Sequence, residues 1–456
     1  MHYQVKSTGN AVFYALLLSL SGWYFGYCVG LFNSFLNHFL LHAYSITDEE
    51  EIKFIAGNLN LSLMIGGMVS CVSAGQLIEL LGRYNTVILF LVGELITIGL
   101  SLYPNLNLLY VLRFFHGYFA CSWTFLGPLM LKENLPNKYS NIFGSCFYIF
   151  ITLGILTSYI FGFDEAGLYW RLIFLLPAVF DLPKLILFVF VYKMESVKWI
   201  FFRYKNKEQR TRLMKKNLRY VYKEEDIDSM TEDLSEEYHM LSKGDEKVHI
   251  SDLFSKDYRL QFFIGILLNF LNQMTGINFL IFYSDKIFTQ LGLPNPALLT
   301  FFMGFMNTLG AIFITIFVNK IGKKTGLVVG LALQSLAYFI FLFGFTFEVG
   351  VMCVIGSYLF IFSFAISLGG IIYSYLVDIV PAIGIGIASF IQWIIGMLVG
   401  KYALNVIDAI GIYAVFVGFM CISLIGCVLV AGYGIETKGK EDHEIKDAFL
   451  KKRFLA

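Results

Sequence analysis

Long apolar runs alternate with short polar segments along nearly the whole chain. A membrane-crossing helix needs about 20 predominantly apolar residues, because the hydrocarbon core of a bilayer is about 30 Å thick. The pattern therefore predicts an all-α membrane protein with one transmembrane helix for each of twelve runs. These runs lie near residues 11–41, 54–81, 86–103, 107–131, 140–163, 170–193, 259–290, 297–319, 325–346, 350–378, 383–404 and 409–433.

A polar stretch at residues 195–257 divides the runs into two groups of six. Its apolar residues recur at helical spacing between many charges, which is typical of short amphipathic helices on a membrane surface. We therefore divide the chain into a first six-helix half (1–194), a linker (195–257), a second six-helix half (258–434) and a tail (435–456).

The composition supports the same class of protein. The chain is 57% hydrophobic and 15% charged, whereas soluble domains are about 45–50% apolar and about 25% charged. A net charge of +1 gives no electrostatic basis for a nucleic-acid partner. The seven cysteines lie in apolar runs without metal-binding spacing, so we expect buried thiols and no metal site. The short polar N-terminus shows no cleavage-site pattern, and we expect no cleaved signal peptide.

Lysine and arginine are concentrated in alternate loops, whereas the remaining loops, such as "SITDEEEIK" and "FDEAG", are acidic or neutral. Basic loops face the cytoplasm in most membrane proteins. We therefore expect both termini to be cytoplasmic, and we expect the plasma membrane as the location. The basic positions are Arg83, Lys132, Lys138, many residues within 198–259, Lys320, Lys323, Lys324 and the tail.

Short motifs recur at the same places in the two halves. "GQLIELLGRY" (75–84) and "NKIGKK" (319–324) follow the second helix of each half, and "MESVKWI" (194–200) and "IETKG" (435–439) follow the sixth. Repeated halves are typical of transporters, whose substrate site lies between the repeats near the bilayer midplane. One chain supplies both halves, and we expect a monomer.

A polar segment, "NQMTGIN" (272–278), interrupts the seventh apolar run. Amide side chains suit a sugar, because each amide has donors and an acceptor for hydroxyl groups without the desolvation cost of a charge. Gln273 and Asn278 converge only if the helix breaks near Gly276, as discontinuous transporter helices do. The alternative interpretation is that these amides hold neighbouring helices together.

The chain resembles the sugar porter family of the major facilitator superfamily through these motifs and others. "GQLIELLGR" is similar to G-x-x-x-D-x-x-G-R, "PLMLKENLP" (128–136) to P-x-Y-x-x-E-x-x-P, and "MESVKWI" to P-E-S-P-R-W-L. "NQMTGIN" resembles Q-Q-x-[ST]-G-I-N, and "IETKG" resembles P-E-T-K-G. The resemblance covers nearly the whole chain and implies the major facilitator fold, with sugar transport by alternating access.

The resemblance also implies a set of sugar-binding positions, and this chain departs from the family at several of them. Tyr148 occupies the place of a family glutamine, Tyr373 that of a tryptophan, and Ala365 that of an acid in several facilitators. The identity of the substrate therefore stays open. The implied substrate-binding residues are Gln273, Asn278, Asn307, Asn272, Phe25, Tyr148, Phe364, Tyr373, Gln392 and Trp393.

The repeated motifs place charged residues where they could hold a gate. Exposed ion pairs are each worth about 0–1 kcal/mol, so such a latch would be weak enough for substrate binding to shift the two states. The alternative role of these charges is anchoring at the membrane surface. The implied gate residues are Arg83, Glu133 and Glu195 in the first half, with Lys323, Lys324, Asp378 and Glu436 in the second.

The mode of transport depends on ionisable residues inside the membrane. Proton-coupled sugar porters resemble one another in an aspartate within F-G-Y-D, and the matching stretch here is "FGYC", which ends at Cys28. A thiol is a poor substitute for a cycling carboxylate, so we predict a facilitative uniporter without a cofactor. Glu94 keeps proton symport open as the alternative, because Asp181 and Lys184, three residues apart, can neutralise each other.

Other functions also remain open at this stage. The same fold could carry another small polar solute such as a polyol, or it could act as a sugar sensor that does not transport. The sequence contains no metalloprotease motif, carboxylate pair on one helix or nucleophile elbow, so we do not expect an enzyme.

Overall fold

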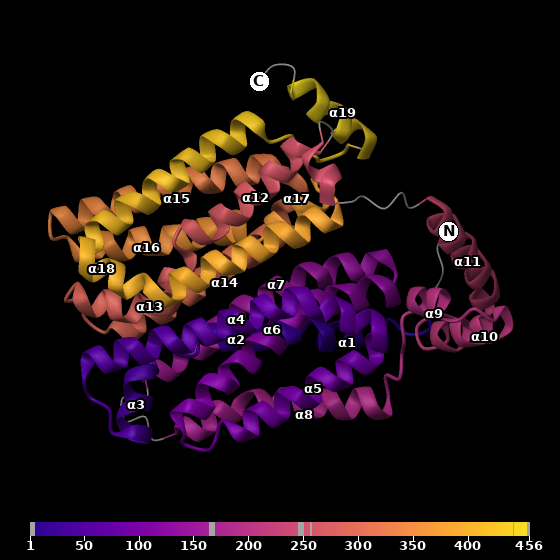
Figure 1. Ribbon diagram of the computed structural model, residues 1–456, viewed down its shortest axis with the longest axis horizontal. Helices are drawn as coiled ribbons and strands as arrows, with labels where there is room; N and C mark the ends of the chain where they lie inside the picture. The colour runs from indigo at the N-terminus through magenta and orange to yellow at the C-terminus, as the bar shows by residue number, and fades with distance from the viewer. Residues whose placement is uncertain (1–4, 164–168, 245–249, 256–257, 441, 454–456) are drawn as a thin grey trace.

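The computed structural model describes residues 5–163, 169–244, 250–255, 258–440 and 442–453. The described residues form helices almost throughout, and their one β-type pairing is an isolated bridge between Val5 and Tyr222. The helices gather in two long bundles that lie side by side (Figure 1). The predicted all-α class is confirmed.

The first bundle, called the N-half, comprises α1 to α8. Its helices are α1 Thr8–Ser19, α2 Ser21–Gly30, α3 Leu36–Tyr44, α4 Glu49–Leu81, α5 Arg83–Leu100, α6 Leu106–Asn134, α7 Asn137–Tyr159 and α8 Trp170–Phe190. The second bundle, called the C-half, comprises α12 to α18. Its helices are α12 Arg259–Met274, α13 Ile277–Gln290, α14 Pro296–Ile321, α15 Lys323–Thr346, α16 Gly350–Phe364, α17 Ile372–Ile379 and α18 Ala382–Tyr433, with one π-helical turn, η4, at Ala365–Gly369.

The described residues include ten helical segments that are long and apolar enough to cross a membrane. Helix α6 is a further crossing of 29 residues that is less apolar than the others, because polar residues such as Arg113 and His116 interrupt it. Helix α18 has 52 residues, or about 78 Å at about 1.5 Å per residue, and it is broken at Gly411 (φ 82°, ψ 153°). It therefore crosses twice, and the structure has the twelve predicted crossings within its described part.

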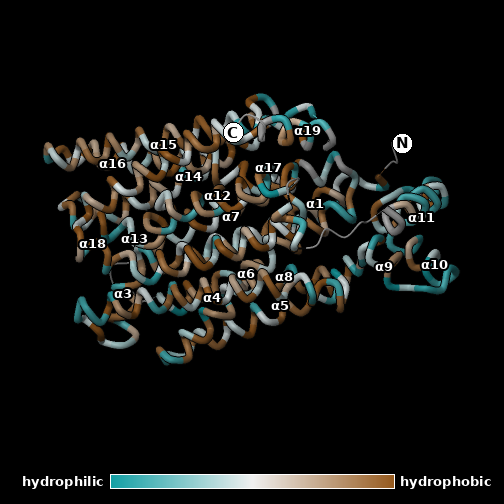
Figure 2. The backbone as a smooth tube through the Cα atoms, turned by 45° about the horizontal axis from the view of Figure 1, so that its top comes forward, coloured by the Kyte–Doolittle hydropathy of each residue, from teal (hydrophilic) through white to brown (hydrophobic). Residues whose placement is uncertain are grey.

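The two ends of the bundles differ in character. At one end, called the linker end, lie α9 Val197–Arg203, α10 Lys207–Leu218, α11 Ile227–Gly244 and the C-terminal α19 Asp442–Arg453 (Figure 1). At the other, called the far end, lie α3 and the bend of α18. Figure 2 shows brown, hydrophobic colour along the bundles and teal, hydrophilic colour in α10, α11 and α19. The apolar lengths therefore match the part that a membrane would enclose.

The linker helices are fastened to the N-half. Helix α9 begins at a Ser196 cap, whose hydroxyl accepts from the Trp199 backbone N–H at 3.1 Å. The Trp199 indole N–H donates to the Glu79 carbonyl of α4 at 2.8 Å, and the Lys6 backbone N–H donates to the Val221 carbonyl at 2.8 Å. Short helices are therefore present in the predicted linker, and α9 lies against the ends of α4 and α6.

Candidate functional site

The seventh crossing breaks where the sequence predicts a break. Helix α12 ends at Met274, and α13 begins at Ile277. Between them Gly276 has φ 93°, in the left-handed region that favours glycine. A Cβ atom at Gly276 would lie 2.7 Å from the Phe419 ring, so close packing also requires glycine there. The break turns the polar segment inward between neighbouring helices.

Four amides gather at this break, and we call them the amide cluster: Asn272, Gln273, Asn278 and Gln392. The Asn278 amide donates to the Gln273 carbonyl at 2.5 Å, and the Gln273 amide donates to the Asn272 carbonyl at 3.0 Å. Gln392 of α18 donates to the same Asn272 oxygen at 3.0 Å. All four side chains are buried. Each amide could exchange these bonds for bonds to substrate hydroxyls, because an amide both donates and accepts.

Other predicted binding residues adjoin the cluster. The Tyr373 hydroxyl lies 3.2 Å from the Gln392 amide nitrogen, and the Asn272 amide donates to the Leu368 carbonyl at 3.1 Å. Leu368 belongs to η4, where Tyr148 and Phe364 both approach Gly369. Trp393 follows Gln392 and packs on Gly67 of α4. The structure thus brings eight of the ten predicted residues to one region.

The other two predicted residues, Phe25 and Asn307, make no described hydrogen bond to the amide cluster. Phe25 is half-buried on α2, and no described contact joins it to the amide cluster. Asn307 is buried on α14, and its side-chain oxygen has no hydrogen-bond partner within the described residues. An unpaired buried oxygen is costly, so Asn307 is suited to accept from a ligand hydroxyl.

The two bundles are joined at the far end. The Asn33 amide of α2's C-terminal turn donates to the Ile281 carbonyl and to the Ser284 hydroxyl, both at 2.7 Å. The Tyr159 hydroxyl donates to the same Ile281 carbonyl at 3.0 Å. Asn60 of α4 donates to the Tyr283 hydroxyl at 3.1 Å. These bonds cross between the halves, so this conformation is closed at the far end.

Lysine side chains reinforce this far-end closure. Lys53 of α4 is ion-paired with Asp408 of α18 and lies 4.0 Å from Glu50. Lys401 of α18 donates to the Asn58 side chain of α4. The sequence analysis missed these pairs, because only the packing of α4 on α18 brings the residues together.

The gate motif of the N-half forms its own set of bonds at the linker end. Arg83 is ion-paired with Glu133 at 2.9 Å and with Glu79 at 2.9 Å. Glu195 accepts from the backbone N–H groups of Arg83 and Tyr84 at 2.8 and 3.1 Å. It therefore caps the start of α5. Burial raises the pKa of Glu195, although these N–H donors oppose the shift.

The C-half repeats the arrangement. Lys323 is ion-paired with Asp378 at 2.6 Å, and the same Asp378 oxygen accepts from Thr437 at 2.6 Å. Glu436 accepts from the backbone N–H groups of Lys323, Lys324 and Thr325 at 2.8, 3.4 and 3.1 Å. Glu436 thus caps α15 instead of pairing with the predicted lysine side chains. Burial alone would raise its pKa, but these donors outweigh burial and lower it.

The buried charges of the N-half form a separate group. Lys184 is ion-paired with Asp181 at 3.0 Å, as their spacing predicts. Its ammonium also lies 4.7 Å from the centroid of the Trp123 ring. The indole N–H of Trp123 donates to Glu94 at 2.5 Å, which is a partner that the sequence did not suggest. Asp181 and Lys184 therefore neutralise each other, and Glu94 keeps one oxygen without a described partner.

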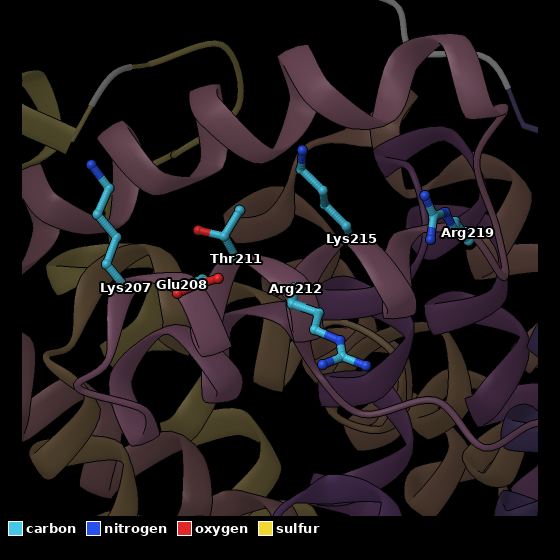
Figure 3. A pocket seen from close by; sticks show the side chains of 6 residues that line it. All are labelled: Lys207, Glu208, Thr211, Arg212, Lys215 and Arg219. Atoms are coloured by element: carbon cyan, nitrogen blue, oxygen red, sulfur yellow. The ribbon is translucent and has the colours of Figure 1, made fainter.

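A surface groove of about 630 Å³ lies along α10, and no residue of the amide cluster lines it (Figure 3). Its cations are partly neutralised, because Lys215 is paired with Asp228 at 2.6 Å and Arg219 with Glu224 at 2.7 Å. Charges of this kind suit water or an anion and do not select a neutral solute. The lining residues are Lys207, Glu208, Thr211, Arg212, Lys215 and Arg219.

Two helical bundles with a buried polar cluster at a broken helix between them define a membrane transporter of the major facilitator class. Solved structures support this fold. The inward-open xylose transporter XylE from E. coli matches with a TM-score of 0.77 at 19% identity, covering 96% of this chain and 99% of that one. XylE with bound 6-bromo-6-deoxy-D-glucose matches with the same TM-score at 18% identity, covering 97% and 100%.

The chain belongs to the sugar (and other) transporter family, which it matches over residues 13–449. It is a transporter and not an enzyme. The plastidic glucose transporter 4 of Arabidopsis thaliana is 25% identical over 97% of this chain and 81% of its own length. The glucose transporter GlcP of Staphylococcus epidermidis is 29% identical over 84% and 86%. The arabinose-proton symporter of Bacillus subtilis is 26% identical over 98% and 96%.

Proposed function

We propose that this protein carries a hexose or a similar sugar across the membrane by alternating access. The buried amide cluster carries this proposal, because four amides at a helix break offer donors and acceptors for several hydroxyl groups. The names of the relatives, which transport glucose, xylose or arabinose, support a sugar substrate. A polyol or another small polar solute would use the same groups.

Uptake by the purified protein in proteoliposomes tests the proposal, with a panel of labelled hexoses, pentoses and polyols. Gln273→Ala leaves the Asn278 amide without its acceptor and the Asn272 oxygen with Gln392 as its remaining donor in the cluster. Losing such a bond costs about 1–3 kcal/mol, so we expect substrate affinity to fall roughly ten-fold or more. Asn269→Ala is the matched control, because Asn269 is a buried amide of the same helix that bonds to the Gly265 carbonyl instead. Equal affinity in Gln273→Ala and the parent would make Gln273 structural. Binding without uptake would favour a sensor.

We propose facilitative transport, because Cys28 stands at the helix position where proton-coupled relatives resemble one another in an aspartate. The second candidate is proton symport. Glu94 favours it, because this buried carboxyl has an oxygen without a described partner. An imposed pH gradient separates the two. Sugar that accumulates above its outside concentration, with an uncoupler abolishing the effect, would refute facilitation and would make Glu94→Gln the next variant.

The proposed orientation places the linker end in the cytoplasm of the cell, with both termini there and with the plasma membrane as the location. Basic residues at this end, including Arg83, Lys132, Lys323 and Lys324, support it. One chain supplies both halves of the site, which supports a monomer. Labelling of single cysteines placed within 195–257 tests the orientation. Their modification by an impermeant reagent outside intact cells would overturn it.

We propose that the linker-end residues form a latch for the outward-facing state: Arg83, Glu133 and Glu195 in the N-half, with Lys323, Lys324, Asp378 and Glu436 in the C-half. In the present conformation their described bonds stay within each half. The far-end bonds cross between the halves instead, which suits the state that is closed to the outside. The latch would therefore act after the bundles tilt to bring the linker ends together.

A further inference from the structure

Two glycines beside the amide cluster each receive an aromatic side chain from the opposite bundle. A Cβ atom at Gly369 would lie 2.0 Å from the Tyr148 hydroxyl oxygen and 2.9 Å from Cζ of that ring. A Cβ atom at Gly67 would lie 2.5 Å from Cζ3 and 2.7 Å from Cη2 of Trp393. Both rings therefore rest directly on backbone, at a separation that any other residue would prevent.

The two contacts are reciprocal. Tyr148 belongs to α7 of the N-half and rests on Gly369 of the C-half, whereas Trp393 belongs to α18 of the C-half and rests on Gly67 of the N-half. Each is adjacent to the amide cluster: Gly369 follows Leu368, whose carbonyl accepts from Asn272, and Trp393 follows Gln392. Two cross-bundle contacts therefore adjoin the cluster.

The contacts at Gly369 and Gly67 lie at a different level along the bundles from the far-end bonds. The far-end bonds hold residues of α13 that come after the cluster, such as Ser284. Tyr373 lies one helical turn beyond Gly369, toward the linker end of α17. It is 51% exposed, although its hydroxyl bonds to buried Gln392. Gln273 and Asn278 of the cluster are, in contrast, only 7% and 8% exposed.

We propose that the pairs Tyr148–Gly369 and Trp393–Gly67 form the linker-side closure of the substrate site, and that Gly67 and Gly369 are positioning residues for this gate. The inference rests on the proposed transport function. The far end is held by hydrogen bonds and an ion pair, whereas these two pairs meet by ring-on-backbone contact. Such dispersion contacts weaken within about 1 Å of separation. A small tilt of the bundles would therefore release a bound sugar toward the linker end.

The test uses Gly67→Ala and Gly369→Ala, each with a reporter cysteine at Asn278 and with the native cysteines replaced. The added methyl groups hold the rings away from the backbone. In vesicles whose linker end faces outward, we expect an impermeant thiol reagent to modify the reporter at least ten-fold faster. The matched controls are Gly75→Ala of α4 and Gly386→Ala of α18, because a Cβ atom at either position meets nothing within 4 Å. Their rates should stay within two-fold of the parent.

A second variant, Tyr148→Phe, separates a local effect at Gly369 from a general loss of helix packing. Tyr148→Phe removes the hydroxyl oxygen that the new methyl group of Gly369→Ala would meet at 2.0 Å. The Cζ contact of 2.9 Å remains in the double variant, which should therefore recover part of the protection, whereas Tyr148→Phe should not rescue Gly67→Ala. Unchanged labelling in both glycine variants would overturn the gate, and so would equal rescue of both.

The outcome is separable from the sugar assignment. If the parent transports no sugar or polyol but the glycine variants still expose the reporter, the transport proposal fails and the closure stands. If the parent transports sugar and the reporter remains protected in both glycine variants, the closure fails alone.

Discussion

The ion pair between Lys53 and Asp408 should hold the far end closed, and reversing one charge should open it. The Lys53 side chain is 11% exposed and that of Asp408 is 51% exposed. Exposed pairs contribute about 0–1 kcal/mol, and the half-exposed Asp408 limits this pair to about 1 kcal/mol. In Lys53→Asp the lost attraction is joined by repulsion from Asp408 and Glu50. The far-end closure should then weaken by about 2 kcal/mol, or roughly thirty-fold in population.

Spin labels at Glu51 of α4 and Gln290 of α13, both exposed, would report the far-end distance by double electron–electron resonance. In Lys53→Asp we expect the distribution of label-to-label distances to gain a component at longer distance. This component should disappear in the exchanged pair, Lys53→Asp with Asp408→Lys. Lys216→Asp on α10 is the control for a change in net charge alone. An unaltered distance distribution in Lys53→Asp, or an exchanged pair as open as the single variant, would refute the reasoning.

Three further predictions follow from the linker-end bonds and the buried charges. Glu133→Gln should change the turnover rate more than substrate affinity, because Arg83 loses its buried partner outside the binding site; an affinity change alone would contradict it. The lowered pKa of Glu436 implies that its carboxylate stabilises the folded protein at neutral pH and that this stabilisation is lost as the pH falls below the usual 4.5. The melting temperature of Glu436→Gln should therefore fall less on acidification than that of the parent. Lys184→Met leaves Asp181 buried and unpaired, which costs about 3–5 kcal/mol, and Lys184→Met with Asp181→Leu should recover most of the lost melting temperature.

The sequence predicts the features that depend on local pattern. The break near Gly276 follows from amides and glycine inside an apolar run, and the pairing of Asp181 with Lys184 follows from their spacing. It predicts the crossing at α6 as well, because the run around Arg113 is long and mostly apolar although polar residues interrupt it.

Features that depend on contacts between distant helices could not be predicted in this way. The pairing of Glu94 with Trp123 requires the packing of α5 on α6, and the contact of Trp393 with Gly67 requires that of α18 on α4. Glu436 shows a different limit. The motif correctly suggests a partner near Lys323, but an acid at a helix start can satisfy either a side chain or backbone N–H groups. Only the placement of the chain decides between them.

The caps formed by Glu195 and Glu436 bear on how the protein is made. Each carboxylate closes the linker end of its own half, against a glycine with φ near 90° (Gly82 and Gly322). The eight helices of the N-half and the cap on α5 are therefore all present in the chain as soon as Glu195 has been synthesised. At about 5–20 residues per second, the remaining 261 residues of the 456 occupy a ribosome for about 13–50 s. The first bundle can use this interval to complete its packing in the membrane before the second bundle arrives.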